Sequence, residues 1–318
     1  MRTVVRTIFL VLGVTAAVAG ANAIAAGRWT ASTPMDEGRA QLGAAAIGDQ
    51  IYVAGGASLA GPVASFDSFD TVSEAWRPLP PLPEGIQSFG IAAVGDVVVI
   101  SGGFSSKAPN KPSARTWVYD THAAQWRKGM DMPGARAGHA LVTLGGKAYA
   151  VGGRGVDARR IYGYDVVTDT WSASAASLGD ELTGHAAVAL ANRVYVVGGK
   201  TSAGRATSDV LVLDPVGGGA VSGPRLPAAL SGHAAAVLAG QIHVAGGAAP
   251  PEMKTSTAHY VLDPSRGAWQ EAAPLLGPRQ GLASAAVGGR WFLIGGSAGS
   301  GFFSAFTAAD AVEIFRPN

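Results

Sequence analysis

Three arginines and three acidic residues recur at fixed positions of a repeating pattern. The arginines, each sixteen residues before a Gly-Gly pair, are Arg39, Arg136 and Arg279. The acids, each eighteen residues before such a pair, are Glu37, Glu84 and Asp180. Arginine presents a fork of donors suited to carboxylates, and a carboxylate can act as a general acid or base. These six residues are therefore candidates for binding an anionic or polyhydroxylated molecule. The alternative is that Arg39 pairs with Glu37 on a solvated loop, which is worth under about 1 kcal/mol.

Three histidines also share one position, thirteen residues before a Gly-Gly pair: His139, His185 and His233. In the other copies of the pattern this position holds Leu42, Phe89 and Leu282. A position that accepts leucine and phenylalanine is a packing position, and histidine is intermediate between typical core and surface residues. The chain has no cysteine, which excludes disulfides, thiolate metal sites and cysteine nucleophiles. We expect no metal site and no cofactor.

The elements that position these residues follow from the Gly-Gly pairs themselves. Six of them end an apolar run, at 55–56, 102–103, 152–153, 198–199, 246–247 and 295–296, with intervals of 46 to 50 residues. Such a period indicates a repeat architecture, which must be recognised before any single element. Glycine makes up 45 of 318 residues, about twice its average usage. Each of these six pairs is expected to end an inner strand where neighbouring backbones crowd and a Cβ would clash.

Each copy predicts four strands. A turn pair such as Gly48-Asp49 begins seven residues before the Gly-Gly pair and indicates a tight hairpin. A third strand ends in aspartate, as in Tyr119-Asp120, where the side chain can cap the turn. A tryptophan such as Trp126 follows six residues later and can bury a large area between sheets. One sheet of this size cannot bury its faces alone, so the copies must stack on one another.

The last copy stops before its tryptophan strand, and the missing strand stands at the other end of the chain. Trp29 precedes the first copy as Trp76 and Trp126 precede later ones. We therefore expect the N-terminal strand to complete the last sheet and to close a ring, with Trp29 as the closing residue. The expected repeats cover about 37–83, 84–133, 134–179, 180–227, 228–276 and 277–318, the last completed by 28–34.

This pattern resembles the kelch repeat, over nearly everything from about residue 28 to 318. The resemblance implies an all-β, six-bladed kelch-type β-propeller with four antiparallel strands per blade. Departures are Ala220 in the tryptophan position and Leu213 and Leu262 in the aromatic position before aspartate. In kelch-like propellers the linkers that enter the blades run toward one mouth of the central channel. The arginine and acid positions would then rim a polar funnel, and Arg154 and Lys200, which directly follow their Gly-Gly pairs, would face the same mouth.

The loop of the last copy supplies a second candidate surface. It holds Phe302, Phe303 and Phe306 among small residues. Three exposed phenylalanines could form a patch that binds a partner. They could equally plug the channel or seal the ring closure.

The N-terminus has the features of a secretory signal. Arg2 and Arg6 precede an apolar run of thirteen residues, and Ala21-Asn22-Ala23 is a small-x-small cleavage pattern. The run is shorter than the roughly 20 residues that span a bilayer. We expect residues 1–23 to be a cleaved signal peptide and 24–318 to be a single propeller, periplasmic or secreted, without stable membrane insertion. The remaining chain has 22 basic and 22 acidic residues, which argues against nucleic acid as a partner.

Two functions fit these observations. The first is a non-catalytic binding module, monomeric, that recognises a protein or glycan ligand through one mouth. The second is a sugar-active enzyme that resembles the periplasmic sialic-acid mutarotases, with Glu37, Glu84 and Asp180 as the acid or base candidates and the arginines for a carboxylate of an anionic sugar. No catalytic residue is assigned. A copper-radical oxidase resembling galactose oxidase needs a Cys-Tyr crosslink, which a chain without cysteine cannot form.

Overall fold

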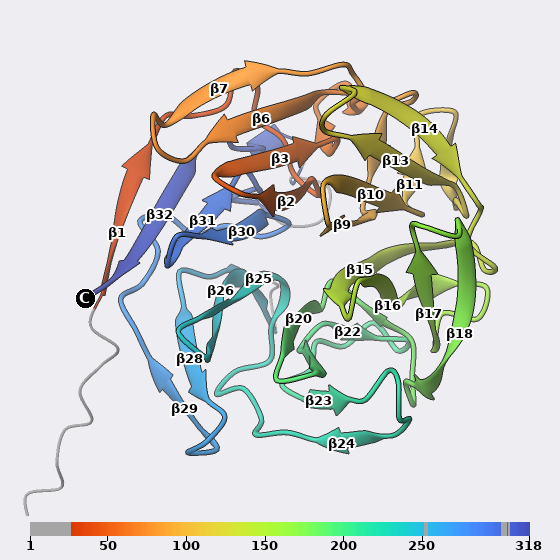
Figure 1. Ribbon diagram of the computed structural model, residues 1–318. Coiled ribbons are helices and arrows are strands. Elements are labelled where there is room, and N and C mark those ends of the chain that lie inside the picture. Colours follow the sequence, from red (N-terminus) through yellow and green to blue (C-terminus); the bar gives the residue numbers. More distant parts are fainter. Residues whose placement is uncertain (1–26, 251–253, 300–303, 305) are drawn as a thin grey trace, which may run out of the picture.

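The computed structural model describes residues 27–250, 254–299, 304 and 306–318. Its main sheets are arranged radially around a central axis (Figure 1). In the described residues six sheets each have four principal strands in antiparallel order, numbered here as blades along the chain. The predicted all-β propeller is therefore confirmed.

In the first three blades the four principal strands follow chain order from the axis outward. Blade 1 consists of β2 (Gly43–Ile47), β3 (Gln50–Ala54), β6 (Phe66–Asp70) and β7 (Ala75–Pro78). Blade 2 consists of β9 (Gly90–Val94), β10 (Val97–Ser101), β13 (Thr116–Asp120) and β14 (Gln125–Gly129). Blade 3 consists of β15 (Arg136–Leu144), β16 (Lys147–Gly155), β17 (Arg160–Asp165) and β18 (Thr170–Ser177).

The last three blades follow the same plan until the chain ends. Blade 4 consists of β20 (Ala186–Leu190), β21 (Arg193–Val197), β23 (Val210–Leu213) and β24 (Ala220–Ser222). Blade 5 consists of β25 (Ser231–Leu238), β26 (Gln241–Ala249), β28 (His259–Asp263) and β29 (Ala268–Glu271). Blade 6 consists of β30 (Ala283–Val287), β31 (Arg290–Ile294), β32 (Val312–Pro317) and the N-terminal β1 (Gly27–Ser32).

Short strands lie in the linkers between blades or in the loops between the second and third strands of a blade. They are β4 (Ala57–Ser58), β5 (Gly61–Pro62), β8 (Ile86–Gln87), β11 (Phe104–Ser105), β12 (Ala108–Pro112), β19 (Leu182–Thr183), β22 (Lys200–Thr201) and β27 (Lys254–Thr255). In the described part of the chain, no helix has the length and apolar character needed to cross a membrane.

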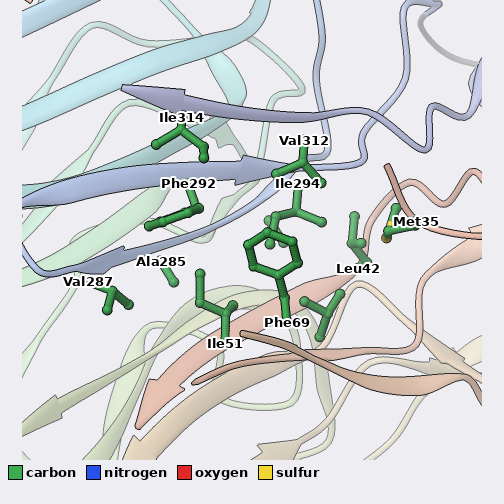
Figure 2. Packing of buried hydrophobic residues seen from close by; sticks show 12 residues of the cluster. Met35, Leu42, Ile51, Phe69, Ala285, Val287, Phe292, Ile294, Val312 and Ile314 are labelled. Carbon is green, nitrogen blue, oxygen red and sulfur yellow. The ribbon is translucent and has the colours of Figure 1, made fainter. Parts of the chain in front are cut away.

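The apolar core lies between blades. Each of six buried clusters combines residues from two consecutive blades, because both faces of every sheet carry apolar side chains. Figure 2 shows the cluster between blades 1 and 6, where Ile51 and Phe69 meet Phe292 and Ile294. The Phe69 and Phe292 ring centroids are 6.0 Å apart. Burial of these faces is the main stabilising term for the stacked sheets.

The Gly-Gly pairs form the joints between blades. The N–H of the second glycine donates to a carbonyl of the next blade, as from Gly199 to Leu230 (2.8 Å) and from Gly247 to Arg279 (2.8 Å). A Cβ on the first glycine of each pair would lie 2.5 to 2.8 Å from that same carbonyl oxygen. Both glycines of every pair also have positive φ. No other residue combines this backbone conformation with the space available.

In most blades a tryptophan on the outer strand forms a hydrogen bond to the preceding blade. The indole Nε1–H donates to a linker carbonyl from Trp29 to Ala273, Trp76 to Thr33, Trp126 to Pro80, Trp171 to Met130 and Trp269 to Pro224, at 2.8 to 3.0 Å. Blade 4 has Ala220 in this position. There a glycine turn replaces the indole, and a Cβ on Gly218 would lie 3.3 Å from the Cβ of Ala175.

The ring closes as the sequence predicts. β1 pairs with β32 in antiparallel register, with Trp29 opposite Phe315. Trp29 is 7% exposed and its ring lies 5.2 Å from Phe315 and 5.5 Å from His259. The residue therefore contacts both its own sheet and blade 5.

We predict that Trp29→Ala lowers the free energy of unfolding by about 3–5 kcal/mol, the usual cost of truncating a buried tryptophan. Arg28→Ala changes an exposed side chain of the same strand and should have little effect. Thermal and urea unfolding of both variants measure this. Equal melting temperatures for Trp29→Ala and the unchanged protein would contradict closure through this residue.

Candidate functional site

One end of the central channel opens into a cavity of about 610 Å³. Most of its lining comes from recurring positions of the repeat, counted from the Gly-Gly pair. The position thirteen residues before the pair lines the cavity in all six repeats, with Leu42, Phe89, His139, His185, His233 and Leu282. The position after the pair lines it in three repeats, with Phe104, Arg154 and Lys200. The positions fifteen and fourteen residues before the pair lie on the linker that enters the blade. Cavities of this size suit a small molecule or the end of a larger ligand.

A closed ring of backbone hydrogen bonds surrounds the axis in this cavity. The N–H groups of Gln41, Ser88, Gly138, Gly184, Gly232 and Gly281 each donate to the carbonyl of the corresponding residue in the preceding blade, at 2.6 to 3.3 Å. All six residues have φ between 54° and 69°. The ring therefore occupies these six N–H groups, which leaves them unavailable as donors to a ligand.

The side of the mouth formed by blades 3 and 4 is cationic. Arg154 is exposed and Lys200 is half-buried, and both line the cavity. The guanidinium carbon of Arg154 lies 5.0 Å from the ring centroid of Phe104, a cation–π contact. Among the described residues, neither cation forms an ion pair with a carboxylate. The prediction that these two residues face the mouth agrees with their position.

The side formed by blades 6, 1 and 2 is neutral and polar. Gln41, Gln87 and Gln280 line it, together with Ser88 and Asn110. The Ser88 hydroxyl donates to Gln41 Oε1 (2.8 Å), and Gln280 Nε2 donates to Gly299 O (2.9 Å). None of the described lining residues is acidic. The mouth can therefore attract negative charge and bind hydroxyl or amide groups.

The three arginines of the linkers do not rim this mouth. Arg39, Arg136 and Arg279 are at most 4% exposed and do not line the cavity. Their Nη1 atoms donate to the carbonyls of Gly55, Gly152 and Gly295, the first glycine of their own Gly-Gly pairs, at 2.9 to 3.3 Å. The prediction that they line a funnel was wrong because backbone carbonyls inside each blade already bind the guanidinium groups.

The charges of these arginines are compensated differently. Arg39 pairs with Asp67 (2.7 Å) and Arg279 with Glu313 (2.8 Å). Arg136 binds only carbonyl oxygens and lies 5.2 Å from the Tyr162 ring. Burial lowers the pKa of Arg136 to about 10. All three side chains hold the strand ends together.

The three acids do not meet in the mouth either. Glu37 is exposed and outside the cavity. Glu84 is buried and its Oε1 pairs with Arg115 Nη1 (2.5 Å). Asp180 is exposed and lines a separate cleft of about 100 Å³ between blades 3 and 4. The predicted common acid rim is thus not formed.

The histidine column is buried at the joints between blades. His139, His185 and His233 are 5 to 7% exposed, and each would contact a Cβ placed on the first glycine of the preceding blade's pair. His139 Nε2 lies 3.1 Å from Ser101 Oγ, and His233 Nε2 lies 3.0 Å from Val197 O. The prediction of a packing column agrees with this position. Within the described ranges, no group of three or more histidine and acidic side chains is placed to hold a metal ion.

Two more buried histidines lie where the ring closes. His243 Nδ1 is 3.0 Å from His259 Nε2, and His259 Nδ1 is 3.1 Å from the carbonyl of Ala273. Trp29, Trp291 and Phe315 surround them, with the Phe315 and His259 ring centroids 4.8 Å apart. Burial lowers the pKa to about 3 for His243 and about 4 for His259.

The phenylalanine patch is described only in part. Phe306 is 58% exposed, whereas Phe302 and Phe303 lie outside the described residues. The segment after Phe306 contacts the linker that enters blade 1. Met35 N donates to Asp310 O (2.9 Å), and Arg39 N donates to Ala309 O (3.1 Å). The segment after Phe306 therefore joins blade 6 to the start of the ring.

Sequence reasoning missed most of the mouth. The polar side chains of Gln41, Ser88, Gln87 and Gln280 were not selected, although they occupy two fixed positions of the repeat. The available signal was variation: these positions hold glycine or alanine in some copies and glutamine, serine or threonine in others. Their polar side chains are not needed for packing, because glycine or alanine fills the same position in other copies.

Fold and mouth together define a kelch-type β-propeller. Residues 138–313 match the KLHDC2/KLHL20/DRC7 Kelch-repeats domain, and residues 38–83 and 87–133 match the Kelch motif. The chain belongs to the kelch-repeat family. Domains of this family are in general protein-interaction modules.

Individual relatives are similar over parts of their length. Kelch-like protein 23 of Homo sapiens is 39% identical over 57 residues, which are 17% of this chain and 10% of that protein. An F-box/kelch-repeat protein of Arabidopsis thaliana is 35% identical over 66 residues, 20% of this chain and 18% of that protein. The solved structure of YjhT has a TM-score of 0.74 at 19% identity and covers 88% of this chain and 95% of its own. That last likeness shows the fold.

We predict that stability falls as the pH drops below about 6.5. The folded pKa values of the five buried histidines are lowered to about 3 or 4 by burial, whereas an unfolded imidazole has a pKa near 6.5. The unfolded chain therefore binds more protons between these limits, and each histidine removes about 2 kcal/mol of stability between pH 7 and pH 5. Urea unfolding at both pH values measures the loss.

His185→Leu provides the matched variant, because Leu42 and Leu282 occupy this position in other blades. The variant should lose about 2 kcal/mol less than the unchanged protein between pH 7 and pH 5. An identical pH dependence in both proteins would contradict a neutral, buried His185.

Proposed function

We propose that this protein is an exported, non-catalytic binding module that recognises a protein or glycan ligand through the mouth between its linkers. The observation that carries the proposal is the open cavity of about 610 Å³ with a polar rim of amides, hydroxyls and two cations. Interaction through such a surface agrees with the general role of kelch domains. Export is supported by the signal-like pattern of residues 1–23, which lie outside the described residues.

A catalytic role of the sialic-acid mutarotase type has less support. Such a reaction needs a general acid or base beside the anomeric carbon. Glu84 is held in an ion pair, Glu37 lies outside the cavity, and Asp180 lies in another cleft. The described lining thus has no carboxylate to transfer protons, and its histidines, His139, His185 and His233, are buried at the joints between blades.

We predict that a bulky side chain in the mouth abolishes ligand capture. Thr183 lines the cavity, and Ala286 lines the channel at its opposite, apolar end, so Thr183→Trp and Ala286→Trp are matched variants. Binding to a glycan array and to periplasmic extract should be lost in Thr183→Trp and kept in Ala286→Trp. Equal capture by both variants would refute recognition through the mouth.

Anomeric exchange of N-acetylneuraminate, followed by NMR, separates binding from catalysis. The proposal predicts no acceleration over buffer by the folded protein. An acceleration that Thr183→Trp removes would establish the enzyme instead.

A further inference from the structure

Charge is distributed unevenly around the mouth. Arg154 and Lys200 belong to adjacent blades and stand at one side, while the glutamines belong to blades 6, 1 and 2. Among the described residues, neither cation forms an ion pair with a carboxylate, and no described lining residue is acidic. Cations held in a walled cavity without compensation raise the local concentration of anions.

We propose that the mouth binds a carboxylate of its ligand between Arg154 and Lys200, while hydroxyl or amide groups of the same ligand contact Gln87 and Gln280. This inference rests on the proposed function, because it assigns a ligand class to the same mouth. The ligand enters in one orientation, with its charged end toward blades 3 and 4.

The backbone fixes the two cations relative to each other. Arg154 pairs with Ala137 within blade 3, and Lys200 pairs with Thr183 at the entry of blade 4. Gly153 pairs with Leu182, so that β16, β19 and β22 form one continuous ribbon across the joint. A carboxylate between the two side chains therefore meets a site that the fold has already positioned.

Phe104 positions the guanidinium of Arg154. Its ring is 9% exposed, and its centroid is 5.0 Å from the Arg154 guanidinium carbon. Phe104 also pairs with Gln87 through β11 and β8, which connects the cationic side of the mouth to the amide side. We assign Phe104 as a positioning residue for the carboxylate.

The test measures affinities for carboxylates and their neutral counterparts by calorimetry or NMR. A sugar arm compares glucuronate with glucose and N-acetylneuraminate with its methyl ester. A peptide arm compares N-acetylalanine with its amide. The arm that binds identifies the source of the carboxylate. In the unchanged protein at least one carboxylate should bind more than about 10-fold better than its neutral counterpart, the effect of one charge-assisted hydrogen bond.

Arg154→Gln and Lys200→Gln should each weaken the carboxylate by about 10- to 100-fold and leave the neutral compound unchanged. Arg193→Gln is the control, because Arg193 pairs with Asp214 away from the mouth. The proposal is overturned if no carboxylate binds, if neutral compounds bind equally well, or if the two mouth variants match the control. When Thr183→Trp abolishes capture but these variants do not, the proposed function stands and this inference fails.

Phe104→Leu and Phe104→Tyr test the positioning role. Leucine should reduce the preference for the carboxylate severalfold without weakening the neutral compound, and tyrosine should restore it because its ring can still face the guanidinium. A purely structural role would lower both affinities equally, and that result would overturn the assignment.

Discussion

The contact on which the propeller depends is the approach of neighbouring backbones at each Gly-Gly pair. One carbonyl of the next blade accepts a hydrogen bond from the second glycine and leaves no room for a Cβ on the first. The ring of backbone hydrogen bonds at the axis and the tryptophan hydrogen bonds at the periphery also join neighbouring blades, at smaller and larger radius. Because blades are joined by backbone groups, their angle is set independently of most side chains.

This construction explains why binding residues can vary between copies. At the linker position fourteen residues before each Gly-Gly pair, the peptide groups are hydrogen-bonded within the ring at the axis. The fold therefore does not require a particular side chain at this position. Four copies place glycine there, while Gln41 and Ser88 add polar groups to the mouth. The residue type also varies at the position after each Gly-Gly pair. Arg154 and Lys200 occupy this position in blades 3 and 4, where other blades have alanine, serine or phenylalanine. A regular scaffold thereby carries an asymmetric site.

Periodicity predicted the strands, the glycine joints and the closing role of Trp29, because these depend on residue types that only one local geometry tolerates. It failed at Arg39, Arg136 and Arg279. A charged residue near a predicted mouth is expected to contact ligand, yet each guanidinium turns inward to carbonyls of its own blade. The direction of a linker side chain depends on which carbonyl groups the folded strands leave without a backbone partner. The residue pattern of the sequence does not predict those carbonyls. Arg154 and Lys200 were recognised because an adjacent glycine pair fixed their place.

The central claim is tested most directly by comparing two glycine substitutions with the same backbone conformation. Gly198 and Gly145 have φ of 58° and 57°, but a Cβ on Gly198 would lie 2.8 Å from the Leu230 carbonyl oxygen, whereas one on Gly145 would contact nothing within 4 Å. Urea unfolding should show a loss of about 1–2 kcal/mol for Gly145→Ala from strain alone, and a further 1–3 kcal/mol for Gly198→Ala from overpacking of the joint. Equal losses in the two variants would contradict the account.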